Sequence, residues 1–335
     1  ADVLNKAGIP VFGPSKAAAQ LEGSKVFAKD LMKKYNIPTA AYGVFHKVDE
    51  AKAFIAQTGA PIVVKADGLA AGKGVVVAMT IDEANVAVED MLSGNRFGDA
   101  GSTVVIEEFM EGEEASLLAF VDGKTVVPMI ASQDHKRIFD GDKGPNTGGM
   151  GTYAPAPVLT DALRDEAMKT ILEPMVAAME KEGMPYVGCL YAGLMITDEG
   201  PKVVEFNARF GDPETQVVLP LLDSDLGEIM MACAKGTLTS NMVKWKDSSA
   251  ACVILASKGY PETSSKGDVI SGDIKQYDTT IVFHSGTKLV GENYVTNGGR
   301  VLGVVGLGKD LRTALDRAYE RIEHIDFEGM QYRTD

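Results

Sequence analysis

Apolar positions in the first part of the chain recur every three or four residues, which is the spacing of an amphipathic helix. Residues 21–35 show this spacing, and Asn36-Ile37-Pro38 predicts the helix end because a residue before proline avoids the helical conformation. Residues 49–58 and 81–92 repeat the pattern. The hydrophobic positions therefore predict three amphipathic helices in this part of the chain.

Short apolar runs rich in β-branched residues separate these helices and predict strands. The runs are Val44-Phe45, 61–66, 75–77 and 104–106. Helices and strands thus alternate along the chain, and we predict a small α/β module with mixed strands.

Two later regions have the pattern of hairpins. The first consists of apolar runs at 115–121 and 126–131 around Asp122-Gly123. The second consists of runs at 191–196 and 202–206, and we expect both regions to form antiparallel strand pairs.

Two helices and one long loop are expected around these hairpins. Residues 160–182 and 225–234 have helical spacing, with a bend expected at Pro174, whose ring cannot fit a regular helix interior. Residues 133–153 are polar and glycine-rich without periodicity. Loops of that length in compact domains are usually functional or disordered, and this composition favours a functional loop.

The two ends of the chain differ from the middle. From residue 246 onward, strands at 251–256, 281–284 and 300–305 and a helix at 311–322 are expected. At the other end, the pattern predicts a helix at 2–7 and a short strand at 9–12, the tail of an α/β unit whose earlier strands are absent.

These elements predict an α/β (α+β) protein with three parts. Residues 1–23 are interpreted as the remnant of an N-terminal α/β domain with its linker. Residues 24–245 form the main domain, which includes a lid subdomain at about 43–110, and residues 246–335 form a small α+β domain.

Composition narrows the classes of partner. The net charge is −14 and the sequence pI is about 4.8, so the surface repels nucleic acid and anionic lipid, and we expect neither as a partner. The sequence contains no run of about 18 apolar residues, so it predicts no membrane-spanning helix. The three cysteines are scattered, which suits a reducing cytoplasm better than a disulfide framework.

The glycine-rich stretch 68–74 is the first candidate for chemistry. It is not a P-loop, because the required glycine and Ser or Thr positions hold Asp67 and Gly74 and a strand follows. Such a hairpin can lie over a triphosphate as a lid, although a plain surface hairpin has the same pattern. Lys65 ends a buried strand just before it and needs an anion, either a phosphate or an internal carboxylate.

Glu205-Phe206-Asn207 is the second candidate. Residues two apart on a strand face the same side, so a carboxylate and an amide oxygen converge. Hard oxygen donors suit Mg²⁺, and Arg209 at the next position on that face could stabilise charge in phosphoryl transfer. A solvated strand face is the alternative reading of the same pattern.

Other patterns either carry less weight or are missing. The strand that ends at Glu107 could offer main-chain groups to an adenine ring, although acidic loops are more often simply solvated. The four histidines have no metal-ligand spacing. There is no Gly-x-Ser-x-Gly elbow and no dinucleotide fingerprint, so hydrolase and oxidoreductase readings are disfavoured.

Taken together, several segments resemble the glycinamide ribonucleotide synthetase family of the ATP-grasp superfamily, and the resemblance covers essentially the whole chain. The segments are Phe12-Gly13-Pro14, 21–25 (LEGSK), 65–74 (KADGLAAGKG), 132–137 (SQDHKR), 144–151 (GPNTGGMG), 191–195 (YAGLM) and 210–216 (FGDPETQ). The resemblance implies an ATP-grasp fold with a small C-terminal α+β domain. It also implies the ATP-dependent ligation of glycine to 5-phosphoribosylamine through glycyl phosphate, in purine biosynthesis.

The resemblance further implies roles for individual residues in ATP binding. Lys25 and Lys65 match the lysines that contact the phosphates, and Gly68, Gly72, Lys73 and Gly74 match the covering loop. Glu107, Phe109 and Met110 match the family's positions at the adenine, and Glu114 matches the acid that binds the ribose.

The remaining roles implied by the resemblance concern the metal and the reaction. Glu205 and Asn207 match ligands of Mg²⁺ or Mn²⁺, and Arg209 matches the arginine near the transferred phosphoryl group, where Lys65 and Asp212 are also expected. The substrate-binding positions are Asp134, Lys136, Asn146, Thr147, Gly148 and Asp212.

The chain departs from the family pattern in two ways. Gly193 is expected opposite Glu205, where many ATP-grasp enzymes have a second metal-binding acid. The resemblance also implies an N-terminal domain that helps to form the phosphoribosylamine site, and we interpret the residues before Phe12 as lacking it. The alternative is therefore a nucleotide-binding module that is catalytically incomplete. We expect small-molecule substrates and a monomer or weak homo-oligomer.

Overall fold

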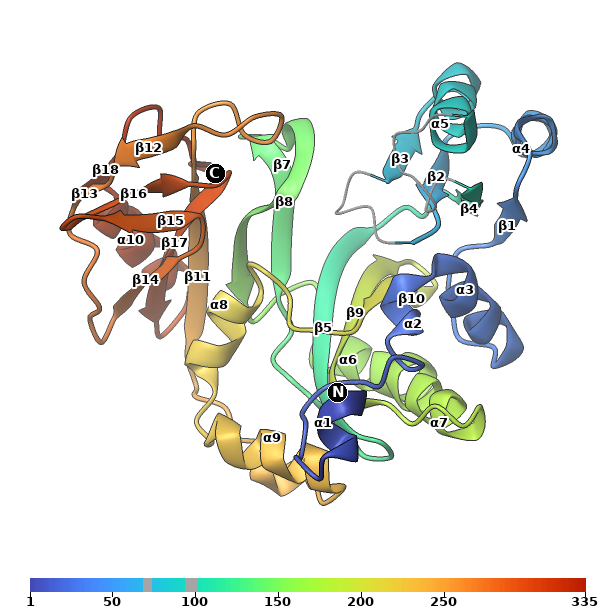
Figure 1. Cartoon of the computed structure of the whole chain (residues 1–335), viewed down its shortest axis with the longest axis horizontal. Helices are drawn as coiled ribbons and strands as arrows, with labels where there is room; N and C mark the ends of the chain where they lie inside the picture. The colour runs from blue at the N-terminus through green and yellow to red at the C-terminus, as the bar shows by residue number, and fades with distance from the viewer. Residues whose placement is uncertain (69–73, 94–101) are drawn as a thin grey trace.

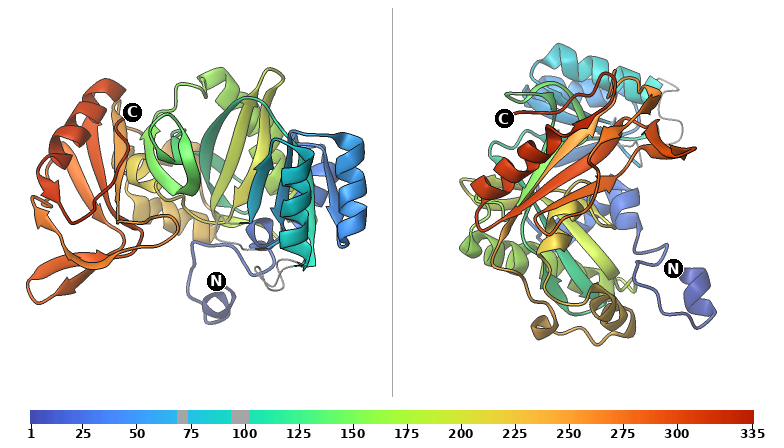
Figure 2. Two further views of the ribbon diagram at one scale, coloured as in Figure 1. Left: turned by 90° about the horizontal axis from the view of Figure 1, so that it is seen from above. Right: turned by 90° about the vertical axis from the view of Figure 1, so that its left-hand side faces the viewer.

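The computed structural model describes residues 1–68, 74–93 and 102–335. The described residues form three larger antiparallel sheets and two small ones, β12-β16-β15 and β13-β18. Figure 1 shows the bodies built around the larger sheets, and the left view of Figure 2, from above, shows these bodies in a row. No helix of the described part is long and apolar enough to cross a membrane.

The first sheet has the strand order β1-β4-β2-β3, with two helices packed on it. Its elements are β1 (Tyr42–Phe45), α4 (Val48–Thr58), β2 (Ile62–Ala66), β3 (Val75–Ala78), α5 (Ile81–Ser93) and β4 (Val104–Glu108). Ile62, Val64 and Ala66 face the helices and are fully buried. Lys65, between Val64 and Ala66, therefore faces the other side of the sheet. The predicted α/β module is confirmed, but its strands are not mixed, because β1–β4, β4–β2 and β2–β3 all pair antiparallel. Its sheet presents a lysine toward the rest of the molecule.

The second sheet has the strand order β10-β9-β5-β6 and is covered on both faces. Its strands are β5 (Glu113–Asp122), β6 (Val126–Pro128), β9 (Val187–Thr197) and β10 (Gly200–Asn207). Along β5, Leu117 and Ala119 pack on one face of the sheet with the helical residues 161–181. Leu118 and Phe120 pack on the other face, in the core shared with the third sheet. This alternation gives β5 a continuous apolar run, as is usual for a strand buried on both faces.

The long helix expected at 160–182 is three consecutive helical segments. These are α6 (Asp161–Ala167), a π-helical turn (Met168–Leu172) and α7 (Glu173–Lys181). The change of helix type lies just before Pro174, which has no N–H to donate to the preceding turn.

The N-terminal segment corrects two expectations. The strand expected at 9–12 does not form, because no strand of the described part pairs with it. The helix expected at 21–35 is instead α2 (Gln20–Gly23) and α3 (Lys25–Lys34), which follow the short α1 (Asp2–Lys6). Ser24 separates them, since its hydroxyl accepts a hydrogen bond from the backbone N–H of Phe27 and caps α3.

The third sheet has the strand order β14-β17-β11-β8-β7 and contains the region expected as a loop. Its strands are β7 (Gln133–Phe139), β8 (Lys143–Ala154), β11 (Ser249–Ala256), β14 (Thr280–His284) and β17 (Arg300–Gly308). The expectation of a loop at 133–153 was wrong, because β8 pairs with the distant β11 from Gly151 to Ala154. Such long-range pairing leaves no periodic signal in the local sequence.

The remaining elements complete this body and connect it to the second sheet. They are α8 (Thr215–Val218), α9 (Leu226–Lys235), β12 (Lys266–Val269), β13 (Ser271–Gly272), β15 (Thr287–Val290), β16 (Asn293–Asn297), α10 (Leu311–Ile322) and β18 (Ile325–Asp326). Short 3₁₀ turns occur at Leu219–Leu221 and Ser240–Met242. The third sheet continues across residue 246, and the domain boundary at that residue stays a prediction.

Candidate active site

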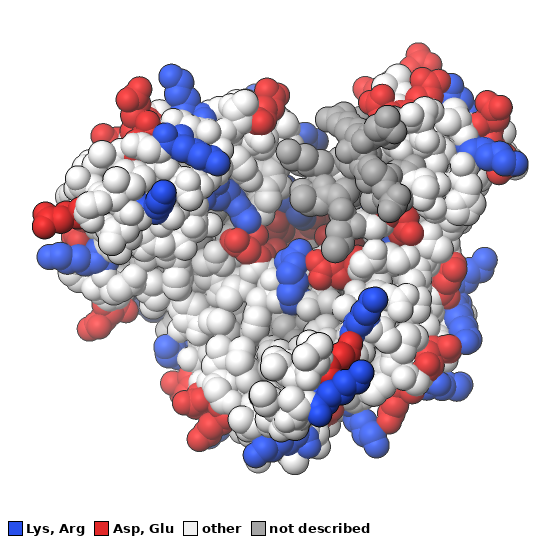
Figure 3. Space-filling model, in the orientation of Figure 1, with Lys and Arg blue, Asp and Glu red and all other residues white. Residues whose placement is uncertain are grey.

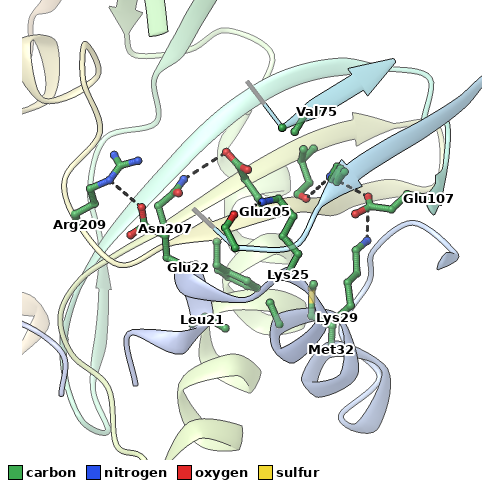
Figure 4. Close-up of a pocket in the computed structure, with 16 residues that line it drawn as sticks. Leu21, Glu22, Lys25, Lys29, Met32, Val75, Glu107, Glu205, Asn207 and Arg209 are labelled. Carbon is green, nitrogen blue, oxygen red and sulfur yellow. Dashed lines mark hydrogen bonds and ion pairs between the residues drawn. The ribbon is translucent and has the colours of Figure 1, made fainter. Parts of the chain in front are cut away.

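A cavity lies where the first sheet, helices α2 and α3, and strand β10 meet (Figure 4). Eight of the predicted site residues line it: Lys25, Lys65, Gly68, Gly74, Glu107, Glu205, Asn207 and Arg209. Residues from separate parts of the sequence therefore converge on one cavity. Figure 3 shows acidic and basic side chains close together in the central hollow of the molecule.

Glu107 is the buried centre of the charges in this cavity. Its Oε2 lies 2.9 Å from Lys65 Nζ and 3.1 Å from Lys29 Nζ, and all three side chains are almost completely buried. Lys65 also donates to the Val204 carbonyl of β10, and Lys29 donates to the Thr39 hydroxyl. The three groups together have a net charge of +1, which favours an anionic ligand.

An unpartnered oxygen of Glu107 and the lowered pKa of Lys29 both fit a ligand site. The second carboxylate oxygen of Glu107, Oε1, is buried and has no hydrogen-bond partner in the described part of the chain. Burial lowers the pKa of Lys29 to about 8, although Glu107 counteracts this effect. Burial thus disfavours the positive charge of Lys29, and an anionic ligand would offset this effect.

Lys25 lies at the N-terminus of α3, where backbone N–H groups are unsatisfied by the helix itself. Its backbone N–H donates to Asp67 Oδ1 at 2.6 Å, and its Nζ donates to the Gly68 carbonyl at 3.0 Å. Burial lowers the pKa of Lys25, against the effect of the Glu205 carboxylate. The helix terminus therefore ties the start of the glycine-rich stretch to the cavity.

Glu205 and Asn207 point into the cavity from the same face of β10, as predicted (Figure 4). Asn207 Nδ2 lies 3.5 Å from Glu205 Oε1, so the side-chain ends are adjacent. Glu205 pairs with Gly193 across the strands, which confirms the expected register. The described residues contain no group of three or more His, Cys, Asp or Glu side chains that could hold a metal. A carboxylate and an amide together still fit a hard cation that takes its other ligands from phosphate and water.

Arg209 lies beside these ligands at the mouth of the cavity. Its Nε donates to Glu22 Oε1 at 3.0 Å, and Glu22 Oε2 accepts from the backbone N–H of Ala208. The Arg209 side chain is 56% exposed, so it remains accessible to a ligand despite this ion pair.

Glu114, Asp134 and Lys136 form a second group, on β5 and β7. Lys136 contacts Glu114 and lies 3.4 Å from Asp134 Oδ1. Burial lowers the pKa of Lys136, but the Asp134 and Glu114 carboxylates outweigh it and hold the pKa above the ordinary lysine range. Next to them, Glu214 is buried and accepts a hydrogen bond from Tyr191, and burial with the nearby Asp134 raises its pKa.

Asn146, Thr147 and Gly148 lie on β8, where Asn146 is exposed at the outer part of the hairpin. Thr147 donates to the Lys136 carbonyl and accepts from the Gly149 N–H, which ties β8 to β7. Asp212 lies after β10 and is joined to this segment by Arg300 of β17.

The other predicted positions lie beside the cavity or outside the described residues. Phe109 and Met110 follow β4, are half-buried and do not line the cavity. Gly72 and Lys73 fall outside the described residues.

Sequence reasoning missed Lys29, Glu22 and Arg300. Lys29 lies four residues after Lys25 on α3, so helical spacing placed both on one face and could have drawn attention to it. Arg300 lies far along the chain from Gly148 and Asp212, and no local pattern connects them.

Two family models match the chain. The phosphoribosylglycinamide synthetase ATP-grasp (A) domain matches residues 23–215, and the C domain of the same synthetase matches residues 250–335. The chain belongs to the phosphoribosylglycinamide synthetase family. A member named phosphoribosylamine–glycine ligase, from Neisseria meningitidis serogroup A, is 54% identical over all of this chain and 79% of its own length.

Solved structures agree with the membership of this synthetase family. The crystal structure of phosphoribosylamine–glycine ligase from Thermotoga maritima matches 96% of this chain and 80% of that chain, with a TM-score of 0.88 and 38% identity. The biotin carboxylase domain of 2-oxoglutarate carboxylase from Hydrogenobacter thermophilus matches 99% of this chain and 72% of that chain, with a TM-score of 0.77 and 17% identity. The second likeness shows the shared fold alone, and the predicted ATP-grasp fold is confirmed.

Proposed function

We propose that this chain uses ATP to join glycine to 5-phosphoribosylamine, giving glycinamide ribonucleotide, ADP and phosphate. The observation that carries the proposal is the convergence of Lys25, Lys65, Glu205 and Asn207 on one cavity. The relatives named phosphoribosylamine–glycine ligase support the same reaction. The biological role is a ligase step of purine biosynthesis.

For ATP, we assign the phosphates to Lys25 and Lys65 at the N-terminus of α3 and the end of β2. The buried net positive charge beside Glu107 supports this assignment. The adenine is assigned to main-chain groups of Phe109 and Met110, with the unpartnered Glu107 Oε1 as a further acceptor.

The rest of the nucleotide is assigned from neighbouring residues. Glu114 would accept hydrogen bonds from the ribose, and the glycine-rich stretch with Gly68, Gly72, Lys73 and Gly74 would cover the phosphates. Gly68 and Gly74 line the cavity, which supports this placement.

For the metal, we assign Mg²⁺, with Mn²⁺ as the other candidate, to Glu205 and Asn207. When bound, the metal would neutralise negative charge on the phosphates during transfer. Two protein oxygens are few, and Mg²⁺ commonly completes its six ligands from water and substrate phosphates.

In the reaction, a glycine carboxylate oxygen attacks the γ-phosphorus and ADP leaves, which forms glycyl phosphate. The amine of phosphoribosylamine then attacks the carbonyl carbon, phosphate leaves and the amine loses a proton. Arg209, with Lys65, is positioned to stabilise charge on the transferred group. Asp134, Lys136, Asn146, Thr147, Gly148 and Asp212 are assigned to substrate binding, and Asp212 additionally to catalysis.

We further propose that the protein acts on small molecules alone, with neither nucleic acid nor membrane as partner. Its net charge of −14 supports this restriction. The three described cysteines are buried and free, which is consistent with a cytoplasmic protein. A monomer or weak homo-oligomer is expected.

Two substitutions test the proposed site. Lys65→Ala is expected to weaken ATP binding measured by calorimetry, because it removes the cation at the phosphates. Glu205→Ala is expected to abolish Mg²⁺-dependent ADP release while ATP still binds. Glu199→Ala is the control, since Glu199 lies in the turn between β9 and β10 and its side chain pairs, within the described part of the chain, only with Lys202. Equal ATP affinity of Lys65→Ala and the parent would refute the assignment of Lys65.

A further inference from the structure

Arg300 of β17 connects two predicted substrate-binding segments that lie far apart in the sequence. Its Nη1 donates to the Gly148 carbonyl at 2.7 Å and to the Asp212 carbonyl at 2.8 Å. Its Nη2 lies 3.1 Å from Asp212 Oδ2. One guanidinium thus holds the backbone of both segments and the carboxylate of Asp212.

The backbone around Arg300 is closely packed, and at Gly149 it requires glycine. A Cβ on Gly148 would lie 3.1 Å from Arg300 Cζ, and a Cβ on Gly149 would lie 2.5 Å from Pro213 Cδ. Gly149 also has a φ of +114°, which other residues rarely adopt. The glycine pair therefore fits between Arg300 and Pro213.

The Asp212 carboxylate is fixed at both oxygens. Gln216 Nε2 donates to Oδ1 at 2.7 Å, while Arg300 binds Oδ2. Because arginine stays charged at any physiological pH and its donors form a rigid planar fork, it can fix a carboxylate and two carbonyls at once. Lysine has the charge but lacks the fork.

We propose that Arg300 is a positioning residue for the substrate side of the site. It acts through Gly148 and Asp212, and through it the C-terminal segment takes part in the reaction. The inference rests on the proposed function, in which Gly148 and Asp212 bind substrate. Arg300 is not among the residues that line the cavity assigned to ATP, so we expect it to affect glycine and phosphoribosylamine rather than ATP. A purely structural role would instead lower stability without changing substrate binding selectively.

The test compares Arg300→Gln and Arg300→Lys with the parent. We expect both variants to raise the KM for at least one of glycine and phosphoribosylamine by about tenfold or more, the effect of losing one charged hydrogen bond. The Kd for ATP, measured by calorimetry, is expected to stay within about twofold of the parent. Arg312→Gln is the matched control, because Arg312 lies exposed on α10 and pairs only with Asp316 among the described residues.

Hydrogen exchange measures the positioning itself and does not depend on turnover. In Arg300→Gln, peptides that contain residues 146–149 and 211–213 are expected to exchange faster, whereas a peptide covering 62–66 is not. Unchanged exchange at both segments, or an equal loss of ATP and substrate affinity, would overturn the proposal. If the parent itself shows no substrate-dependent ADP release, the proposed function fails, and the exchange result still decides whether Arg300 positions the two segments.

Discussion

At the scale of single residues, the site depends on one carboxylate shared by two lysines. Glu107 Oε2 contacts both Lys29 and Lys65, and this arrangement leaves one uncompensated positive charge in a buried place. The sequence identified Lys65, because a lysine that ends an apolar strand needs an anion. It assigned Glu107 to the adenine through its main chain, and it gave no sign that the side chain pairs with Lys29. That pairing depends on how α3 packs against the first sheet.

Replacing Glu107 tests this shared pairing. Glu107→Gln leaves both lysines without a buried counter-ion, and removal of one partner from a buried ion pair costs about 3–5 kcal/mol. We expect chemical denaturation to show a loss of that size. The control is Glu108→Gln on the same strand, where the side chain is exposed and the loss should stay below about 1 kcal/mol. Similar stabilities of the two variants would contradict the account.

The lowered pKa of Lys29 predicts a pH dependence of stability. The pKa is about 8 in the folded state against an ordinary 10.5, so above pH 8 the unfolded chain binds more protons than the folded chain. The free energy of unfolding should therefore rise with pH through this window. Since other groups titrate too, the quantity to measure is the difference from Lys29→Met, which lacks this titration. That difference should increase between pH 8 and 10, and a flat difference would show that Lys29 titrates normally.

At the scale of elements, local patterns predicted most helices and strands and the pairings of the two hairpins, but not the partners that lie far apart in the sequence. A period of two in the sequence predicted which residues of the first sheet face inward. It also predicted the register that places Gly193 opposite Glu205. The hairpin of β7 and β8 was missed because its outer half is polar and exposed, and its inner end is held by β11. Exposed polar residues lack the apolar alternation from which strands are recognised.

Gly149 provides a prediction at this scale. Gly149→Ala combines an unfavourable positive φ with a Cβ that would collide with Pro213, so we expect a loss of roughly 3 kcal/mol or more, since overpacking alone costs about 1–3. Gly236→Ala is the control, because Gly236 also has a positive φ but no atom within 4 Å of the added Cβ. The control should lose only about 1 kcal/mol in denaturant unfolding. Equal losses would mean that the contact with Pro213 is unimportant.

At the scale of the whole molecule, the cavity proposed for ATP lies between the first sheet and strand β10 of the second sheet, whereas β7 and β8 of the third sheet carry several of the residues proposed for the substrates. The resemblance of short motifs identified the family before any contact was known, and the family models match most of the chain. The contribution of the C-terminal segment through Arg300 was beyond reach of the sequence, because it depends on a sheet that joins β7 and β8 to β11 and β17. Whole-molecule arrangement therefore decides which distant residues act together.

The most direct test of the ligase is ADP release from Mg-ATP by this chain, with glycine and 5-phosphoribosylamine each omitted in turn. The account predicts release that requires both substrates and disappears in Glu205→Ala. ATP binding without release under any of these conditions would contradict the ligase and favour a nucleotide-binding module. Release that is indifferent to glycine would equally refute the proposed reaction.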